Sequence, residues 1–108
     1  MIAWITESMT IRLPVDLTGA QAVVSVEQFA DYSTAPTVIK DESPTVTVSD
    51  GQSTVEAVFT QAQTGQLRAG VAKVQCNWVF SDGTRDAMAE VEVEVRHNQL
   101  QAVMTYAT

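Results

Sequence analysis

The sequence has little of the residues from which most metal sites and catalytic sites are built. Its 108 residues include one cysteine, Cys76, and one histidine, His97. A single cysteine allows no internal disulfide, and one cysteine with one histidine gives no cluster that could hold zinc. The five glycines are scattered, so there is no glycine-rich loop to bind a phosphate group. We therefore expect neither a metal nor a cofactor.

Positive charge is also scarce, and long apolar runs are missing. Six Lys and Arg residues stand against 13 Asp and Glu residues, which gives a net charge of −7 at pH 7. This is the wrong sign for binding nucleic-acid phosphates through counterion release. No run approaches the roughly 20 apolar residues of a membrane helix, and residues 1–5 lack the basic start of a signal peptide. We expect neither a nucleic-acid partner nor a membrane partner.

What the sequence has instead is an alternation of apolar and polar residues with a period of two. Its hydrophobic content of 45% suffices for one core, so we expect a single domain over residues 1–108. The alternation runs through residues 8–15, 21–29 and 37–40, with a loop between the last two over residues 31–36. Such a pattern is typical of strands that bury one face.

The pair Asp50-Gly51 predicts a hairpin with a defined register. Aspartate followed by glycine favours a two-residue turn, because glycine readily adopts the positive φ that such a turn needs. The opposed residues are then Val46 with Val55 and Thr47 with Thr54. Apolar side chains meet on one face of this hairpin and hydroxyl groups on the other.

The pair Asp82-Gly83 predicts a second, longer hairpin by the same reasoning. The expected inward pairs are Trp78 with Ala87, Cys76 with Ala89, Val74 with Val91, and Ala72 with Val93. The expected outward pairs are Lys73 with Glu92 and Gln75 with Glu90. A slip of one residue would expose Trp78 and bury three glutamates, so the alternation fixes the register strongly.

Two further segments are not strands by their pattern. Thr60 and Gln63 can cap each other's backbone amides and Gly65 can close the turn, which predicts one helical turn with Leu67 tucked under the rim. The segment over residues 97–108 fits either a helical face or a last strand over residues 101–106.

Seven or eight short strands, separated by turns about every ten residues, predict an all-β fold. The best architecture is an immunoglobulin-like antiparallel β-sandwich of seven or eight strands. The Cys–Trp–Cys signature of antibody domains is absent, because Cys76 has no partner.

The sequence offers no convincing catalytic arrangement. A catalytic His97 would need an adjacent nucleophile and an orienting acid, and Cys76 falls on an inward face, where thiols are inert. Glu90, Glu92 and Glu94 form an acidic row that suits a solvated face or a basic partner. Asp82 and Asp86 flank a hairpin tip without the further acids of a calcium site. We expect a protein that is not an enzyme.

The remaining candidates are surface contacts. Val71, Val79 and Met88 fall on outward positions of the long hairpin, with Val79 and Met88 near each other beside the turn. Trp4 lies outside any clear alternation. Because tryptophan and methionine are enriched at protein interfaces, these four residues are the candidate partner contacts.

A pattern over residues 55–103 points to a family. It consists of Thr60-Gln61-Ala62-Gln63-Thr64, Leu67, Gly70, Val74-Gln75, Trp78, Asp82-Gly83, Val95, Leu100 and Val103. The pattern resembles that of small β-sandwich proteins encoded by phages and prophages of Gram-positive bacteria. The resemblance implies a virion structural component of the tail or baseplate region without enzymatic activity, and it identifies no binding residues.

The leading hypothesis is therefore a non-enzymatic phage structural protein that docks onto other virion proteins in many copies. We expect it in the virion, in the tail region rather than the head, and in the host cytoplasm before assembly. One alternative is a capsid decoration protein on the head. The other is a carbohydrate-binding or host-adhesion module, for which Trp4, Tyr32 and Tyr106 are the available aromatic residues.

Overall fold

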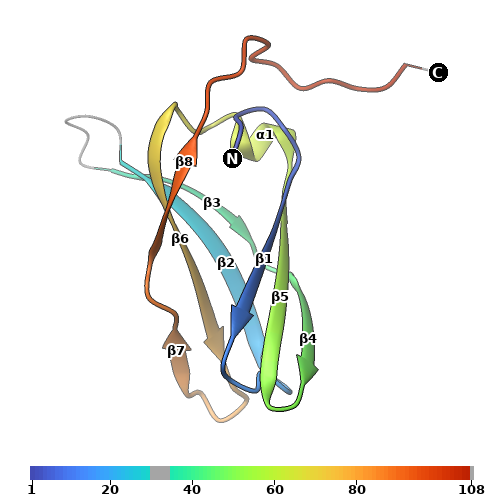
Figure 1. Ribbon diagram of the computed structural model, residues 1–108, viewed down its shortest axis with the longest axis vertical. Coiled ribbons are helices and arrows are strands. Elements are labelled where there is room, and N and C mark those ends of the chain that lie inside the picture. Colours follow the sequence, from blue (N-terminus) through green and yellow to red (C-terminus); the bar gives the residue numbers. More distant parts are fainter. Residues whose placement is uncertain (30–34, 108) are drawn as a thin grey trace.

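The computed structural model describes residues 1–29 and 35–107, and these are almost entirely strands and loops (Figure 1). The short helix α1 (Gln61–Thr64) is the only helix within these ranges. The strands are β1 (Glu7–Leu13), β2 (Gln21–Gln28), β3 (Thr37–Asp41), β4 (Thr45–Ser49), β5 (Gln52–Phe59), β6 (Gly70–Val79), β7 (Arg85–Ala87) and β8 (Val91–Val95).

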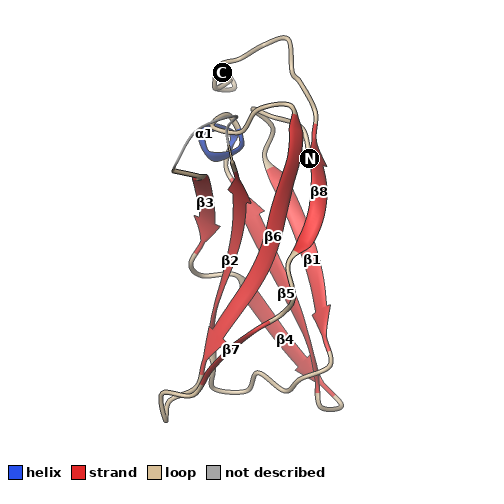
Figure 2. Ribbon diagram, turned by 90° about the vertical axis from the view of Figure 1, so that its left-hand side faces the viewer, coloured by secondary structure: helices blue, strands red, loops and turns tan. Residues whose placement is uncertain are grey.

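The strands form two antiparallel sheets that pack face to face. One sheet has the order β1-β5-β4, and the other has the order β3-β2-β6-β7, with β8 pairing the other end of β6. Figure 2 shows the five-stranded sheet towards the viewer with the three-stranded sheet behind it. The all-β architecture of two antiparallel sheets is thus confirmed.

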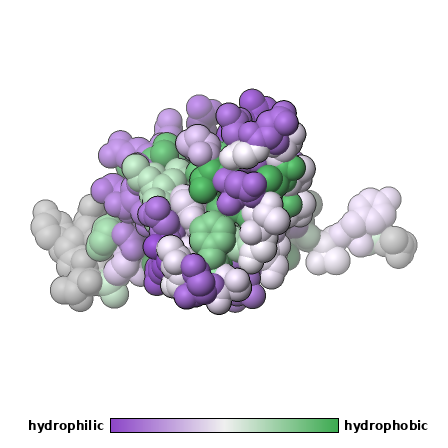
Figure 3. All heavy atoms as spheres, turned by 90° about the horizontal axis from the view of Figure 1, so that it is seen from below, coloured by the Kyte–Doolittle hydropathy of each residue, from purple (hydrophilic) through white to green (hydrophobic). Residues whose placement is uncertain are grey.

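The core lies between the sheets, and alternate residues of β2, β5 and β6 supply most of it. Phe59, Val24 and Val26 are fully buried, and so is the inward-facing Cys76. The remaining buried apolar residues are Ala3, Leu13, Leu17, Ala22, Ile39, Val55, Ala57, Leu67, Ala72, Val74, Trp78 and Val95. The lower end of the molecule shows apolar atoms among polar side chains (Figure 3), so the two sheets are not covered there by a continuous polar layer.

The first predicted hairpin is confirmed in turn and register. Asp50 and Gly51 both have positive φ, at 53° and 74°, as the expected two-residue turn requires. The pairs Val46 with Val55 and Thr47 with Thr54 are formed between β4 and β5.

The second hairpin differs from the prediction near its turn. The amide of Phe80 donates to the carbonyl of Thr84, and Gly83 has a φ of 88°, so the loop has three residues rather than two. This moves the register by one, and the expected pairs of Trp78 with Ala87 and Cys76 with Ala89 were wrong. The observed pairs are Asn77 with Ala87, Trp78 with Asp86, and Val79 with Arg85.

A β-bulge restores the predicted register further from the turn. The amide of Met88 donates to the carbonyl of Cys76, whereas Val91 pairs with Val74. Met88 and Val91 are three positions apart, whereas their partners Cys76 and Val74 on β6 are two positions apart. The segment between β7 and β8 therefore holds one extra residue. The predicted pairs of Val74 with Val91, Lys73 with Glu92, and Ala72 with Val93 are confirmed. Gln75, expected opposite Glu90, donates its Nε2 proton to the Met88 carbonyl at 2.9 Å.

The helical turn was predicted correctly in its capping. Thr60 Oγ1 accepts from the amide of Gln63, and Gln63 Oε1 accepts from the amide of Thr60. Gly65 ends the turn with ordinary helical φ rather than positive φ. Leu67 is buried as expected.

Some expected boundaries differ from the structure. The first strand begins at Glu7 and ends at Leu13, and the second ends at Gln28. Most of the predicted loop over residues 31–36 lies outside the described residues; residues 35 and 36 are irregular. Residues 97–107 form neither the expected helix nor the expected strand, and they run as an irregular segment beyond the sandwich (Figure 1).

Candidate contact surfaces

Trp4 packs on the end of the sandwich rather than standing free. Its backbone has a positive φ of 64°, which turns the chain from the N-terminal segment into β1. The indole lies directly over Gly65, and a Cβ added to Gly65 would overlap the ring. The ring is therefore half-buried, so only part of it is available to a partner.

A polar hollow of about 310 Å³ lies beside Trp4 at this end of the molecule. Arg68, His97, Asn98 and Gln101 contribute to its lining. Asn98 closes one wall by donating its Nδ2 proton to the Ala3 carbonyl at 3.0 Å. The described residues that line it include no carboxylate, thiol or hydroxyl group, so no nucleophile or acid shares this hollow with His97.

Val71 and Val79 lie on the outer face of the five-stranded sheet, at opposite ends of β6. Val71 is exposed and pairs with Glu94, whereas Val79 is half-buried and pairs with Arg85. Eight residues of extended strand separate them, which is roughly 26 Å. They therefore belong to two separate surfaces.

The surface around Val79 is a shallow hollow of about 480 Å³ on the outer face. Its apolar floor is formed by Val79 with Val23 and Val38. Lys40 and Arg85 bring two of the six basic side chains to its rim. Arg85 is held by a hydrogen bond from its Nη2 to Asn77 Oδ1.

Met88 does not lie on the outer face beside Val79, so that part of the prediction was wrong. The shifted register places Met88 opposite the buried Cys76, and its side chain packs half-buried against the core. The physical reason is the bulge between Met88 and Val91. Its extra residue reverses the side of the sheet to which the residues before the bulge point.

The structure reveals a contact surface that the sequence did not indicate, on the flank where the edges of β1 and β8 face each other. Val95, Val93 and Val91 all point inward, because their partners on β6 include the buried Ala72 and Val74. Their burial nevertheless falls along the strand: Val95 is 1% exposed, Val93 is half-buried, and Val91 is 51% exposed. An inward-facing valine is thus half open to solvent.

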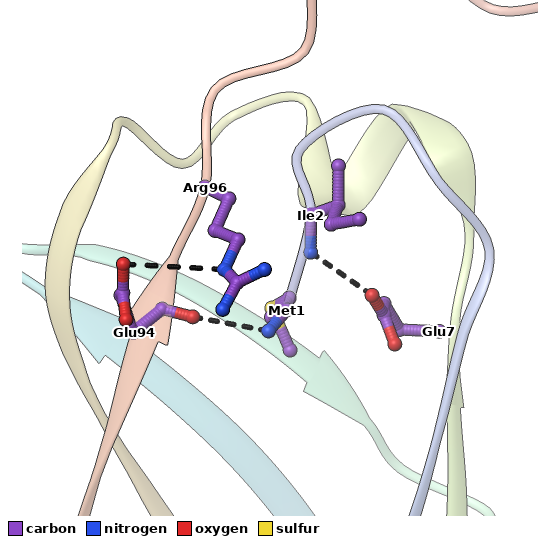
Figure 4. A network of polar contacts seen from close by, with 5 residues as sticks. All are labelled: Met1, Ile2, Glu7, Glu94 and Arg96. Carbon is purple, nitrogen blue, oxygen red and sulfur yellow. Dashed lines mark hydrogen bonds and ion pairs between the residues drawn. The ribbon is translucent and has the colours of Figure 1, made fainter.

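The N-terminal segment explains where this exposure begins. Figure 4 shows the Met1 ammonium group donating to the Glu94 carbonyl at 3.0 Å, and the Ile2 amide donating to Glu7 Oε1 at 2.9 Å. Ile2 also forms a parallel bridge with Arg96. Residues 1–3 therefore cover the upper part of the flank only. Below them, no strand within the described ranges pairs with the outer edge of β1 or β8.

Met9 and Ile11 of β1 border the same flank. Both face inward, since their partners on β5 are the buried Ala57 and Val55. Both are only half-buried. We use the name open flank for the inward-facing, incompletely covered residues Met9, Ile11, Val91 and Val93.

The opposite flank, between β3 and β5, is closed. Asp41 at the end of β3 accepts hydrogen bonds from the amides of Val58 and Ser43, at 2.9 and 3.0 Å. Gln63 donates its Nε2 proton to the Lys40 carbonyl at 2.7 Å. These contacts join the two sheets where the chain passes from β3 to β4, so the two flanks are not equivalent.

The titratable groups show where charge is and is not available. Complete burial raises the pKa of the Cys76 thiol to about 11, so the nucleophilic thiolate is suppressed. Hydrogen bonds from Thr18 lower the pKa of Asp16, and hydrogen bonds from Thr84 lower the pKa of Asp82. The described part of the chain brings no three metal-binding side chains together. Glu92 and Glu94 on β8 are exposed, and so is Glu90 directly before this strand.

Comparison with known proteins gives no match to a family model, to a curated protein or to a solved structure. Among the described residues, no helix has the length and apolar character that crossing a membrane requires.

Proposed function

We propose that this chain is a non-enzymatic structural protein of a bacteriophage virion, which docks onto neighbouring subunits through the open flank of an immunoglobulin-like sandwich. The partners are other virion proteins, and the location is the tail or baseplate region. The observation that carries the docking role is Val91, an inward-facing core position that is 51% exposed at a free sheet edge.

The strand order supports the immunoglobulin-like assignment. In such sandwiches one sheet carries strands A, B, E and D, and the other carries strands C, F and G, with C′ and C″ added in variable domains. The orders β1-β5-β4 and β3-β2-β6-β8 fit B-E-D and C′-C-F-G. The parallel bridge of Ile2 with Arg96 then places the N-terminal segment beside strand G.

The physics of free edges supports the docking role. An edge strand offers unpaired backbone donors and acceptors, and a partner can add a strand to it. Here the free edge lies next to uncovered apolar side chains, so added backbone pairing would also bury Val91 and Val93. Many copies in a ring or lattice would turn such modest contacts into firm attachment.

The virion location rests on the sequence pattern over residues 55–103, which resembles that of small phage β-sandwich proteins. The two alternatives differ in place or ligand. A capsid decoration protein would use the same contacts on the head. A glycan-binding module would use exposed aromatic rings, of which Tyr106 is 90% exposed.

The test is to separate a phage lysate on a density gradient and locate the protein with an antibody. We expect it in the particle fraction, with immunogold labels on tails. Labels on heads would favour the decoration protein. Protein that stays at the top of the gradient, free of particles, would contradict a virion role, and a strong glycan-array signal would favour the adhesion module.

A further inference from the structure

The open flank has uncovered side chains and also a stretch of backbone edge with which no described strand pairs. The carbonyl of Glu94 and the amide of Arg96 both bond to Met1, so these groups point outward from β8. Residues two apart on a strand point their amides and carbonyls to the same side. The amide and carbonyl of Glu92 therefore point along the flank, where an extended segment could pair with them and cover Val91.

The C-terminal segment of the chain has the properties that such a site requires. Residues 98–107 carry no charged side chain. Leu100, Val103, Met104 and Tyr106 are all exposed, so the segment buries little apolar surface on its own domain. Nine extended residues span roughly 30 Å, which is enough to run the length of β1.

The segment is directed away from the flank of its own chain. Residues 1–3 already occupy the upper edge of β8, and Asn98 bonds to the Ala3 carbonyl where the segment leaves. Further on, Gln61 bonds to both backbone groups of Met104: its Nε2 donates to the carbonyl at 3.0 Å, and its Oε1 accepts from the amide at 2.7 Å. Figure 1 shows the segment running over α1 and away from β8.

We infer that residues 99–107 of one copy lie along the open flank of a second copy, between its β1 and β8. The backbone of the segment pairs with Glu92, and its apolar side chains cover Val91, Met9 and Ile11. This inference names one partner for the proposed function, a second copy of this chain. It rests on the proposed function, which places the two copies in a virion.

Charge favours this occupant over the direct pairing of two flanks. Glu92 and Glu94 are exposed on β8 and the exposed Glu90 directly precedes this strand, and each chain carries a net charge of −7. Two flanks placed edge to edge would bring these carboxylates together, and like charges on paired strands are destabilising. An uncharged segment avoids that repulsion. Because the segment and the flank are different surfaces, the contact is heterologous and builds a ring or a filament.

The test uses disulfide trapping between two single-site variants of the full chain. Purified Val91→Cys and Met104→Cys are mixed under mild oxidation, and the mixed dimer is measured on a non-reducing gel. Cys76 stays in place because it is fully buried. The matched control is a mixture of Val58→Cys with Met104→Cys, because Val58 is 50% exposed but lies on the outer face of β5. Circular dichroism confirms that each variant is folded.

We expect the mixed dimer of Val91→Cys with Met104→Cys to form severalfold faster than that of Val58→Cys with Met104→Cys. Equal rates would overturn the inference. Dimers of Val91→Cys with itself as the main product would mean flank-to-flank pairing and would also overturn it. A third protein carries both Val91→Cys and Met104→Cys in one chain. A disulfide within its monomer would mean that the segment fills its own flank, and this result would overturn the inference as well.

A second measurement separates this inference from the proposed function. Sedimentation of the purified protein should show weak association that rises with concentration and disappears when residues 99–108 are removed. Association that survives the removal would contradict the inference. Particle binding is measured in the same preparations. If the truncated protein still binds particles and its self-association is unchanged, the virion role stands, and only the docking of residues 99–107 on a second copy is rejected.

Discussion

The indole ring of Trp4 lies directly over Gly65, at a distance that leaves no room for a Cβ on the glycine. Gly65 has ordinary helical φ, so the reason for a glycine here is this close approach and not the backbone conformation. The contact joins the N-terminal segment to the end of α1. It also sets the direction in which the chain enters β1, beside the open flank.

The variant Gly65→Ala should destabilise the fold, because the added methyl group would push the ring of Trp4 out of place. Overpacking of this kind costs about 1–3 kcal/mol. Urea unfolding measures the change. In the background of Trp4→Ala the same substitution should cost much less, since the overlapping ring is gone. Equal costs in both backgrounds would show that the two residues do not interact.

The variant Asp41→Ala should destabilise the closed flank. It removes the carboxylate that accepts from the amides of Val58 and Ser43, and a hydrogen bond to a charged group contributes about 1.5–3 kcal/mol. Glu42→Ala is the matched control, because Glu42 is the exposed neighbouring acid. A loss of the same size in both variants, measured by urea unfolding, would contradict the bridging role of Asp41.

The thiol of Cys76 should make the protein less stable as the pH rises above about 9. The unfolded thiol ionises near its ordinary pKa of 9.0, whereas burial raises the pKa in the folded protein to about 11. Between these values the unfolded state loses a proton that the folded state keeps, which costs roughly 2 kcal/mol by pH 11.

Urea unfolding at pH 7.5 and pH 10.5 measures this loss. The comparison is with Cys76→Ala, which lacks the thiol and keeps every other side chain of the protein. The wild type should lose more stability than the variant over this interval. Parallel losses would show that the thiol is not protected by the fold.

Val91 should tolerate a polar side chain, although its pattern in the sequence is that of a core residue. In dilute protein, Val91→Thr should cost less than about 0.5 kcal/mol, the usual limit for exposed positions. Its register partner Val74 is buried, so Val74→Thr should cost about 1–3 kcal/mol for the buried hydroxyl. A similar cost at both positions would mean that Val91 is covered within the single chain.

The sequence was sufficient for the parts of the fold that depend on alternation. The register of β6 with β8 followed correctly from the run of inward valines, because a slip there would bury Glu92 and Glu94. The hairpin at Asp50-Gly51 followed from the turn residues alone. In both places the local pattern and the tertiary packing favour the same arrangement.

The register at the second turn could not be read from the sequence. A three-residue loop ending at Gly83 and a two-residue turn at Asp82-Gly83 use the same glycine. The choice between them depends on whether a bulge further along takes up the extra residue, and the alternation near Met88 does not reveal one. The predicted position of Met88 failed for this reason.

The open flank could not be predicted either. Alternation identifies which residues point inward, but it does not say whether another strand lies beside them. Val91 and Val95 have the same pattern, and only the three-dimensional position of residues 1–3 makes one exposed and the other buried.

The most direct test of the docking role compares particle binding by Val91→Glu and Val58→Glu. The two valines are 51% and 50% exposed, on the open flank and on the outer face of β5 respectively. Each tagged variant is mixed with particles that lack the protein, and the bound fraction is measured after sedimentation. We predict that Val58→Glu binds as the wild type does and that Val91→Glu remains in solution. Equal binding by the two variants would contradict a contact through the open flank.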